Sequence, residues 1–181
     1  MERTLTPVAP HVTIRQATEL DHARLSRLVR GWWGERPPRI ERLWFRQFPR
    51  TALVGETADG RPVALAIGFA GDPDAPRAAV YVVAVAPDIR RRGVGRGILA
   101  ALEERLAAAG ATAAEAVVWP GNRVAIRFLA AQGYEPVLES RATPLYGVPA
   151  IAGFDGDDED RAVLFRSFAG PAETVSPPEV R

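Results

Sequence analysis

Apolar residues recur along this 181-residue chain with two periods, and the change from one to the other marks the expected elements. Alternating or continuous apolar runs predict β-strands at residues 12–16, 51–57, 62–70, 80–85, 115–119, 134–140 and 162–168. Apolar residues three and four apart predict helices at about 18–30, 39–48, 94–109 and 123–132. An Asp59-Gly60 turn predicts that the second and third strands form a hairpin.

The most informative segment is residues 79–98, where an apolar strand ends at Ala86-Pro87 and a helical pattern soon begins. The turn between them is rich in glycine and arginine: Gly93, Gly95, Gly97, Arg90, Arg91, Arg92 and Arg96. Backbone N–H groups at a helix start lack partners, and the helix dipole adds partial positive charge there. Glycines let a phosphate approach the main chain, so the sequence predicts a cradle for a polyanionic ligand.

The spacing of the glycines separates the candidate ligands. A dinucleotide fingerprint needs a small residue at position 98, and Ile98 disfavours a nucleotide-binding oxidoreductase. A P-loop needs a lysine, and all 23 basic residues of this chain are arginines. The remaining pattern, Arg90-x-x-Gly93-x-Gly95 after a strand that ends in Val-Ala-Pro, resembles the acyl-CoA-binding motif of the GNAT N-acetyltransferase superfamily.

The resemblance continues as far as residue 134. The family pattern there is a strand followed by Asn, Ala-Ile, an aromatic residue and a terminal Gly-Phe or Gly-Tyr. The residues of this chain that fit it are Asn122, Ala125, Ile126, Gly133 and Tyr134. The resemblance implies an α/β fold of the α+β type, with a central mixed, mostly antiparallel sheet that is flanked by helices and splayed at the cofactor strand. The strand–helix–strand order over 80–119 itself favours a parallel crossover.

The resemblance also implies an activity: an acyltransferase of the EC 2.3.1 class that moves an acetyl group from acetyl-CoA directly to a primary amine. The expected cofactor-binding residues are Val83, Val85, Arg90, Arg91, Arg92, Gly93, Val94, Gly95, Arg96 and Asn122. The backbone N–H of Val83 is the expected oxyanion donor. Asn122 is equally suited to cap the following helix.

Proton transfer is the least determined part of the expected site. The family's usual tyrosine acid is replaced here by Leu129, and its usual carboxylate base by Ala79. A catalytically silent acyl-CoA-binding or sensing module therefore stays open as a second hypothesis. Tyr81 shares a strand face with Val83 and Val85 and is the first candidate for a site-facing hydroxyl, with packing at the strand edge as its alternative. Weaker candidates are Glu115, Tyr146 and Glu56.

The acceptor is expected to be a small-molecule or peptide amine. The first helices of this fold usually line the acceptor pocket, so the residues expected to contact it are Trp32, Trp33 and Glu35. Aromatic residues at helical spacing are more often part of a core, and this alternative remains open for both tryptophans.

Composition narrows the picture further. A net charge of +1 argues against a nucleic-acid binder, and the absence of cysteine excludes a thiolate nucleophile and a disulfide framework. Two isolated histidines and an acidic run at 155–160 give no metal-ligand pattern, so no metal is expected. No signal peptide or membrane segment is expected, which favours a cytoplasmic protein. We expect a flexible arm at 1–10, one domain at 11–169 and a flexible tail at 170–181, with a homodimer among the expected assemblies.

Overall fold

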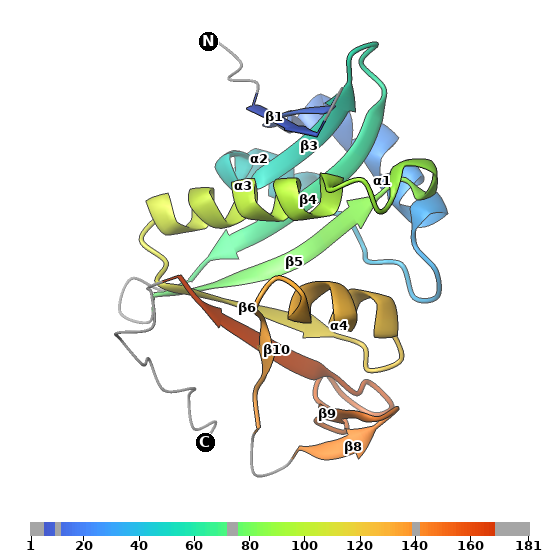
Figure 1. Ribbon diagram of the computed structural model, residues 1–181, viewed down its shortest axis with the longest axis vertical. Coiled ribbons are helices and arrows are strands. Elements are labelled where there is room, and N and C mark those ends of the chain that lie inside the picture. Colours follow the sequence, from blue (N-terminus) through green and yellow to red (C-terminus); the bar gives the residue numbers. More distant parts are fainter. Residues whose placement is uncertain (1–5, 10–11, 72–75, 139–141, 169–181) are drawn as a thin grey trace. The chain divides into compact units, whose positions relative to one another are not determined.

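The computed structural model of the protein describes residues 6–9, 12–71, 76–138 and 142–168 (Figure 1). Contacts within the chain gather into two compact units, residues 1–69 with 80–109 and residues 70–79 with 110–181. Strand β5 (Arg77–Val85) contributes its first residues to the second unit and the rest to the first unit. Within the described ranges, no helix combines the length and apolar character needed to cross a bilayer.

The first unit is built on a sheet whose strands follow the order β1 (Thr6–Ala9), β2 (Val12–Gln16), β3 (Ala52–Thr57), β4 (Pro62–Ala70) and then β5. The first four strands pair antiparallel with their neighbours. The predicted hairpin of β3 and β4 is confirmed, with Gly60 at a φ of +78° in its turn. Such a φ suits glycine, which has no Cβ to clash with the main chain.

Helices cover both faces of this sheet (Figure 1). On one face, α1 (His22–Trp32) and α2 (Arg42–Gln47) bury side chains such as Leu25, Val29 and Phe45 against β3, β4 and β5. On the other face, α3 (Val94–Ala108) lies against β2 and β3. The apolar face predicted for α3 is buried: Val94, Ile98, Leu99, Leu102 and Leu106.

The second unit centres on β6 (Ala113–Val118), which pairs in parallel with the first residues of β5, from Arg77↔Ala113 to Ala79↔Glu115. This pairing confirms the predicted parallel crossover. Strand β10 (Ala162–Ser167) runs antiparallel to β6 and to the short β7 (Glu135–Pro136). Helix α4 (Arg123–Ala130) follows β6 in the chain. The sheet is therefore mixed and mostly antiparallel, as the resemblance implied.

Two strand pairs differ from the expectation. Strand β1 forms within the expected arm at 1–10, where it pairs with β2, while residues 1–5, 10–11 and the tail from 169 lie outside the described part. Strands β8 (Thr143–Leu145) and β9 (Val148–Ala150) form a hairpin that sequence reasoning did not predict. Prolines inside both strands hide their β-pattern, because proline is read as a strand breaker.

A buried ion cluster links three elements of the first unit. The Arg15 side chain is only 7% exposed and donates from Nη2 to Asp21 Oδ1 at 2.8 Å and from Nε to Glu56 Oε2 at 2.8 Å. Thr18 adds donors to Asp21 from its N–H and its hydroxyl. Burial raises the pKa of Asp21, but the hydrogen bonds from Arg15 and Thr18 outweigh it and lower that pKa to about 2. The carboxylate therefore stays charged far into the acid range.

Candidate active site

The glycine- and arginine-rich turn becomes the start of α3. Gly93 is the N-cap residue with a φ of +83°, and its carbonyl accepts the first helical hydrogen bond, from Gly97 N–H at 3.0 Å. In the described part of the chain, no main-chain or capping partner is recorded for the N–H groups of Val94, Gly95 and Arg96. A Cβ built on Gly93 would meet no other atom within 4 Å, so the space in front of this turn is open.

This geometry fits a phosphate group. The free N–H groups and the dipole of a 15-residue helix attract an anion. The exposed side chains of Arg91, Arg92 and Arg96 surround the same turn and add full positive charges. The strand–turn–helix geometry predicted from the sequence is therefore present, and binding of a phosphate by it remains a prediction.

Arg90, by contrast, braces the turn. Its Nε donates to the carbonyl of Val85 at 3.0 Å, and its Nη2 donates to the carbonyl of Trp32 at the end of α1. Arg61 braces the other side through a 2.9 Å ion pair with Asp88, which lowers the pKa of that carboxyl below its usual value. This pairing offsets the one acidic charge next to the cradle.

Strand β5 presents its main chain on the edge opposite β4. The N–H of Ala86 donates to Val63 in β4 at 2.8 Å, and N–H directions alternate along a strand. By this alternation the N–H groups of Val83 and Val85 point away from β4, and the Val85 carbonyl on that edge is the one that Arg90 binds. The N–H of Val83 therefore has the direction that an oxyanion donor to a ligand on this edge needs.

Tyr81 of β5 packs at the end of an aromatic cluster that includes Trp44 of α2 and Phe69 of β4. Its ring packs edge-on against Trp44 with centroids 4.5 Å apart, and it is tilted against Phe69 at 5.8 Å. Its hydroxyl donates to the carbonyl of Arg39 at 3.0 Å. Burial, with the charge of Glu41 in second place, raises the pKa of Tyr81 above its usual value. The residue is still 39% exposed, so its side chain is held by these contacts and remains accessible to solvent.

The residues expected to contact the acceptor are divided between core and surface. Trp32 and Trp33 are half-buried and pack against the α1–α2 face of the first unit's core. Glu35 is exposed. Core packing thus buries part of each indole ring. A role in acceptor binding remains a prediction for all three residues.

Asn122 begins α4 in the second unit. Its Oδ1 accepts from Ala125 N–H at 3.1 Å, which confirms the predicted N-cap. Its own N–H donates to the carbonyl of Trp119 at 2.9 Å. The Trp119 ring lies over Gly121 so closely that a Cβ there would stand 2.4 Å from it. From the β8–β9 turn, Tyr146 packs edge-on against the Trp119 ring, with ring centroids 5.8 Å apart.

The weaker candidates for proton transfer are engaged elsewhere. Glu56 belongs to the buried cluster around Arg15, so it is a structural carboxylate. Glu115 pairs with Arg77 at 3.5 Å. Leu129 is buried at 5% exposure, and its side chain carries no proton donor that could serve as the family's usual acid. Tyr81 is thus the candidate whose hydroxyl is held by a hydrogen bond and whose residue lies on the same strand as the predicted donor, Val83.

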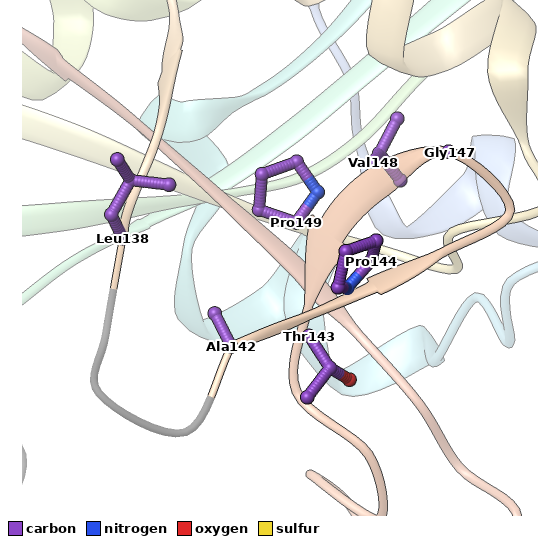
Figure 2. A pocket seen from close by; sticks show the side chains of 7 residues that line it. All are labelled: Leu138, Ala142, Thr143, Pro144, Gly147, Val148 and Pro149. Carbon is purple, nitrogen blue, oxygen red and sulfur yellow. The ribbon is translucent and has the colours of Figure 1, made fainter.

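The described part of the chain includes two hollows of several hundred Å³. One, of about 330 Å³, lies at the β8–β9 hairpin and is lined by apolar side chains and Thr143 (Figure 2). The other, of about 420 Å³, lies in the first unit between α1 and residues 37–41 and carries charged side chains. Within the described ranges, no group of three or more His, Cys, Asp or Glu residues is arranged to hold a metal ion.

The fold and this cradle define a class of α/β proteins that bind a phosphate-bearing ligand where a strand turns into a helix. The chain belongs to the acetyltransferase (GNAT) family, whose family model matches residues 16–134. That range includes β5, the cradle and Asn122.

Individual relatives agree with this assignment. The chain is 36% identical over 124 residues to the L-2,4-diaminobutyric acid acetyltransferase of Nocardia farcinica; the match covers 68% of this chain and 62% of that relative. Its fold is similar to that of Ard1 from Thermoplasma volcanium, with a TM-score of 0.70, 18% identity and coverage of 88% of this chain and 99% of the other. It is also similar to a Paenibacillus lautus diaminobutyrate acetyltransferase solved with L-2,4-diaminobutyric acid and coenzyme A, with a TM-score of 0.61, 24% identity and coverage of 84% and 93%.

Proposed function

We propose that this protein transfers an acetyl group from acetyl-CoA directly to a primary amine. The observation that carries the proposal is the start of α3, where unpartnered N–H groups, an open glycine and three exposed arginines form a site for phosphate groups. Membership of the GNAT family supports an acyl-CoA as the phosphate-bearing ligand of this site. The chain has no cysteine, so transfer has no route through a thiol ester on the protein.

The residues of this chain divide the work of the reaction. Bound acetyl-CoA supplies an activated thioester, whose C–S bond breaks as the C–N bond to the amine forms, with one proton passing from nitrogen to sulfur. The cradle, together with Val85, holds the phosphate-bearing part of the ligand, and binding of the ligand by Asn122 stays a prediction. The N–H of Val83 donates to the oxygen that gains charge, a contribution of about 10²–10³ in rate for one such donor. We assign proton donation to Tyr81; burial raises the pKa of its hydroxyl, which is protonated at neutral pH as that of any tyrosine is.

The name of the Nocardia farcinica relative makes L-2,4-diaminobutyric acid the first acceptor to test. We place Trp32, Trp33 and Glu35 near the acceptor, since α1 ends there and Arg90 ties that end to the cradle. A cytoplasmic location and a homodimer are further parts of the proposal. They rest on the sequence alone.

Release of free CoA tests the proposal directly. When acetyl-CoA is mixed with the protein and each amine of a panel, we expect release of the CoA thiol. A thiol-reactive dye measures the rate of this release. The protein itself adds no background, because it has no cysteine. Gly93→Asp places a carboxylate in the open space of the cradle and should weaken acetyl-CoA binding at least tenfold in calorimetry. Parent-like binding in this variant would overturn the cradle assignment.

A silent acyl-CoA-binding module is the second candidate. Leu129 and Ala79 favour it, since they occupy the positions of the family's usual acid and base. Such a module would bind acetyl-CoA with the same dependence on Gly93 but would release no CoA with any amine in the panel.

A further inference from the structure

We propose that the charged hollow between α1 and residues 37–41 binds the carboxylate of the acceptor, and that the acceptor is an amino acid rather than a plain amine or a peptide N-terminus. This inference rests on the proposed function. It concerns a surface of the first unit that is separate from the cradle.

The hollow has a fixed shape. One wall is a single face of α1, on which His22, Ser26 and Arg30 follow each other at four-residue spacing. The other wall is the extended segment from Pro37 to Glu41, where two successive prolines restrict the backbone. His22 Nε2 lies 2.9 Å from the Ile40 carbonyl and fastens the two walls to each other. The volume of about 420 Å³ is sufficient for a small amino acid.

The charges of the hollow suit a zwitterion. Arg30 and Arg39 bring two guanidinium groups, and Glu41 brings one carboxylate. Arg39 pairs with Glu41, whereas no ion pair or hydrogen bond of the Arg30 side chain is recorded among the described residues. A guanidinium group without a protein partner can bind a carboxylate through two parallel hydrogen bonds. The Glu41 carboxylate, which pairs with the exposed Arg39, lies in the same hollow, and a ligand ammonium group would compete with Arg39 for it.

The hollow is also connected to the candidate acid. Arg39 lines it, and the carbonyl of the same residue accepts the hydrogen bond of Tyr81. Glu41 lines it as well, and its charge contributes to the environment of the Tyr81 hydroxyl. The segment that forms one wall of the hollow thus also contacts the group that we propose for proton transfer.

Pairs of acceptors that differ only in the carboxylate test this inference. L-2,4-diaminobutyrate, L-ornithine and L-lysine are compared with their decarboxylated forms, 1,3-diaminopropane, putrescine and cadaverine. For the best pair we expect kcat/KM to be at least tenfold higher for the amino acid. Arg30→Ala should remove about tenfold of that preference and leave kcat/KM for the diamine and the Kd of acetyl-CoA unchanged.

Arg27→Ala is the matched control, because Arg27 is exposed on the same helix and does not line the hollow. Equal effects of Arg27→Ala and Arg30→Ala, or equal turnover of both members of every pair, would overturn the inference. If no amine is acetylated, calorimetry with L-2,4-diaminobutyrate decides the matter separately. Binding that Arg30→Ala abolishes supports the hollow while the proposed function fails, and absence of binding to the parent refutes the hollow.

Discussion

Single side chains in this protein combine a structural contact with an expected chemical role. Tyr81 donates its hydroxyl to the Arg39 carbonyl, Arg90 binds the carbonyls of Val85 and Trp32, and Asn122 caps α4. Each side chain is thereby held in one orientation before any ligand arrives. A group that is already oriented loses less entropy when the reaction needs it. Substitution of such a residue therefore affects both stability and activity, and an experiment has to separate them.

For Tyr81, the informative change is Tyr81→Phe, which removes the hydroxyl and leaves the ring on Trp44 and Phe69. We expect kcat to fall more than tenfold, since general acid catalysis contributes about 10²–10⁴, while the Kd of acetyl-CoA stays constant. Steady-state kinetics and calorimetry measure the two quantities. Tyr146→Phe is the comparison, because Tyr146 is the weaker tyrosine candidate and is exposed in the other unit; its kcat should stay at the parent's value if Tyr81 is the acid. An unchanged kcat in Tyr81→Phe would leave Tyr81 with a packing role only.

At the level of elements, the starts of α3 and α4 determine where ligand-binding groups lie. The two helices begin differently: α3 has glycine at its N-cap and leaves its first N–H groups free, whereas α4 has Asn122, which satisfies one of them. A free helix start is suited to an anion, and a capped one is suited to stability. Only the first of the two is therefore a candidate for phosphate binding.

The two roles of Asn122 can be separated by a pair of variants. Asn122→Ala removes the cap and should lower the free energy of unfolding by about 1 kcal/mol. Asn122→Ser keeps a capping oxygen and should cost only a few tenths of that amount. If the amide also binds the cofactor, both variants raise the KM for acetyl-CoA, even though only one is destabilised. Urea unfolding and kinetics on the same samples provide the comparison.

Elements with a strong periodic pattern were predictable from the sequence, and those with a broken pattern were not. The hairpin of β3 and β4, the parallel partner of β5 and the capped start of α4 agree with the expectation. The β8–β9 hairpin was missed because its residues alternate poorly and include prolines. The cluster of Arg15, Asp21 and Glu56 was missed for another reason: Glu56 is 41 residues from Arg15 in sequence, and only the pairing of β2 with β3 brings the two together. The same limit applies to the hollow beside α1.

At the scale of the whole molecule, the buried cluster makes stability depend on pH in the acid range. The pKa of Asp21 is about 2 in the folded protein and 3.8 in an ordinary environment, so the unfolded chain binds this proton first. Stability from Asp21 is complete above its ordinary pKa and is lost as pH falls toward 2. Urea unfolding between about pH 5 and pH 2 should show this loss in the parent.

Two variants check the origin of that loss. Asp21→Asn should be less stable than the parent at neutral pH and should lose less stability on acidification. Asp157→Asn, on an exposed loop, should follow the parent at every pH. Arg15→Ala removes the guanidinium group that pairs with the partly buried carboxylates of Asp21 and Glu56 and should cost about 3 kcal/mol at neutral pH. Parallel acid profiles for parent and Asp21→Asn would contradict the proposed cause.

The contact of the Trp119 ring with Gly121 has a consequence for how this protein can change during evolution. A methyl group at 121 collides with the outer atoms of the indole, so Gly121→Ala alone should displace the Trp119 ring from its contact with Tyr146 and destabilise the protein. With a small residue at 119 the space opens, and the same substitution should become acceptable. The effect of a substitution at 121 therefore depends on the residue at 119. Replacement of Trp119 before Gly121 should avoid the destabilised intermediate. A stability scan of all single and paired substitutions at 119 and 121 would show this dependence: Gly121→Ala should be destabilising with Trp119 and tolerated with a small residue at 119.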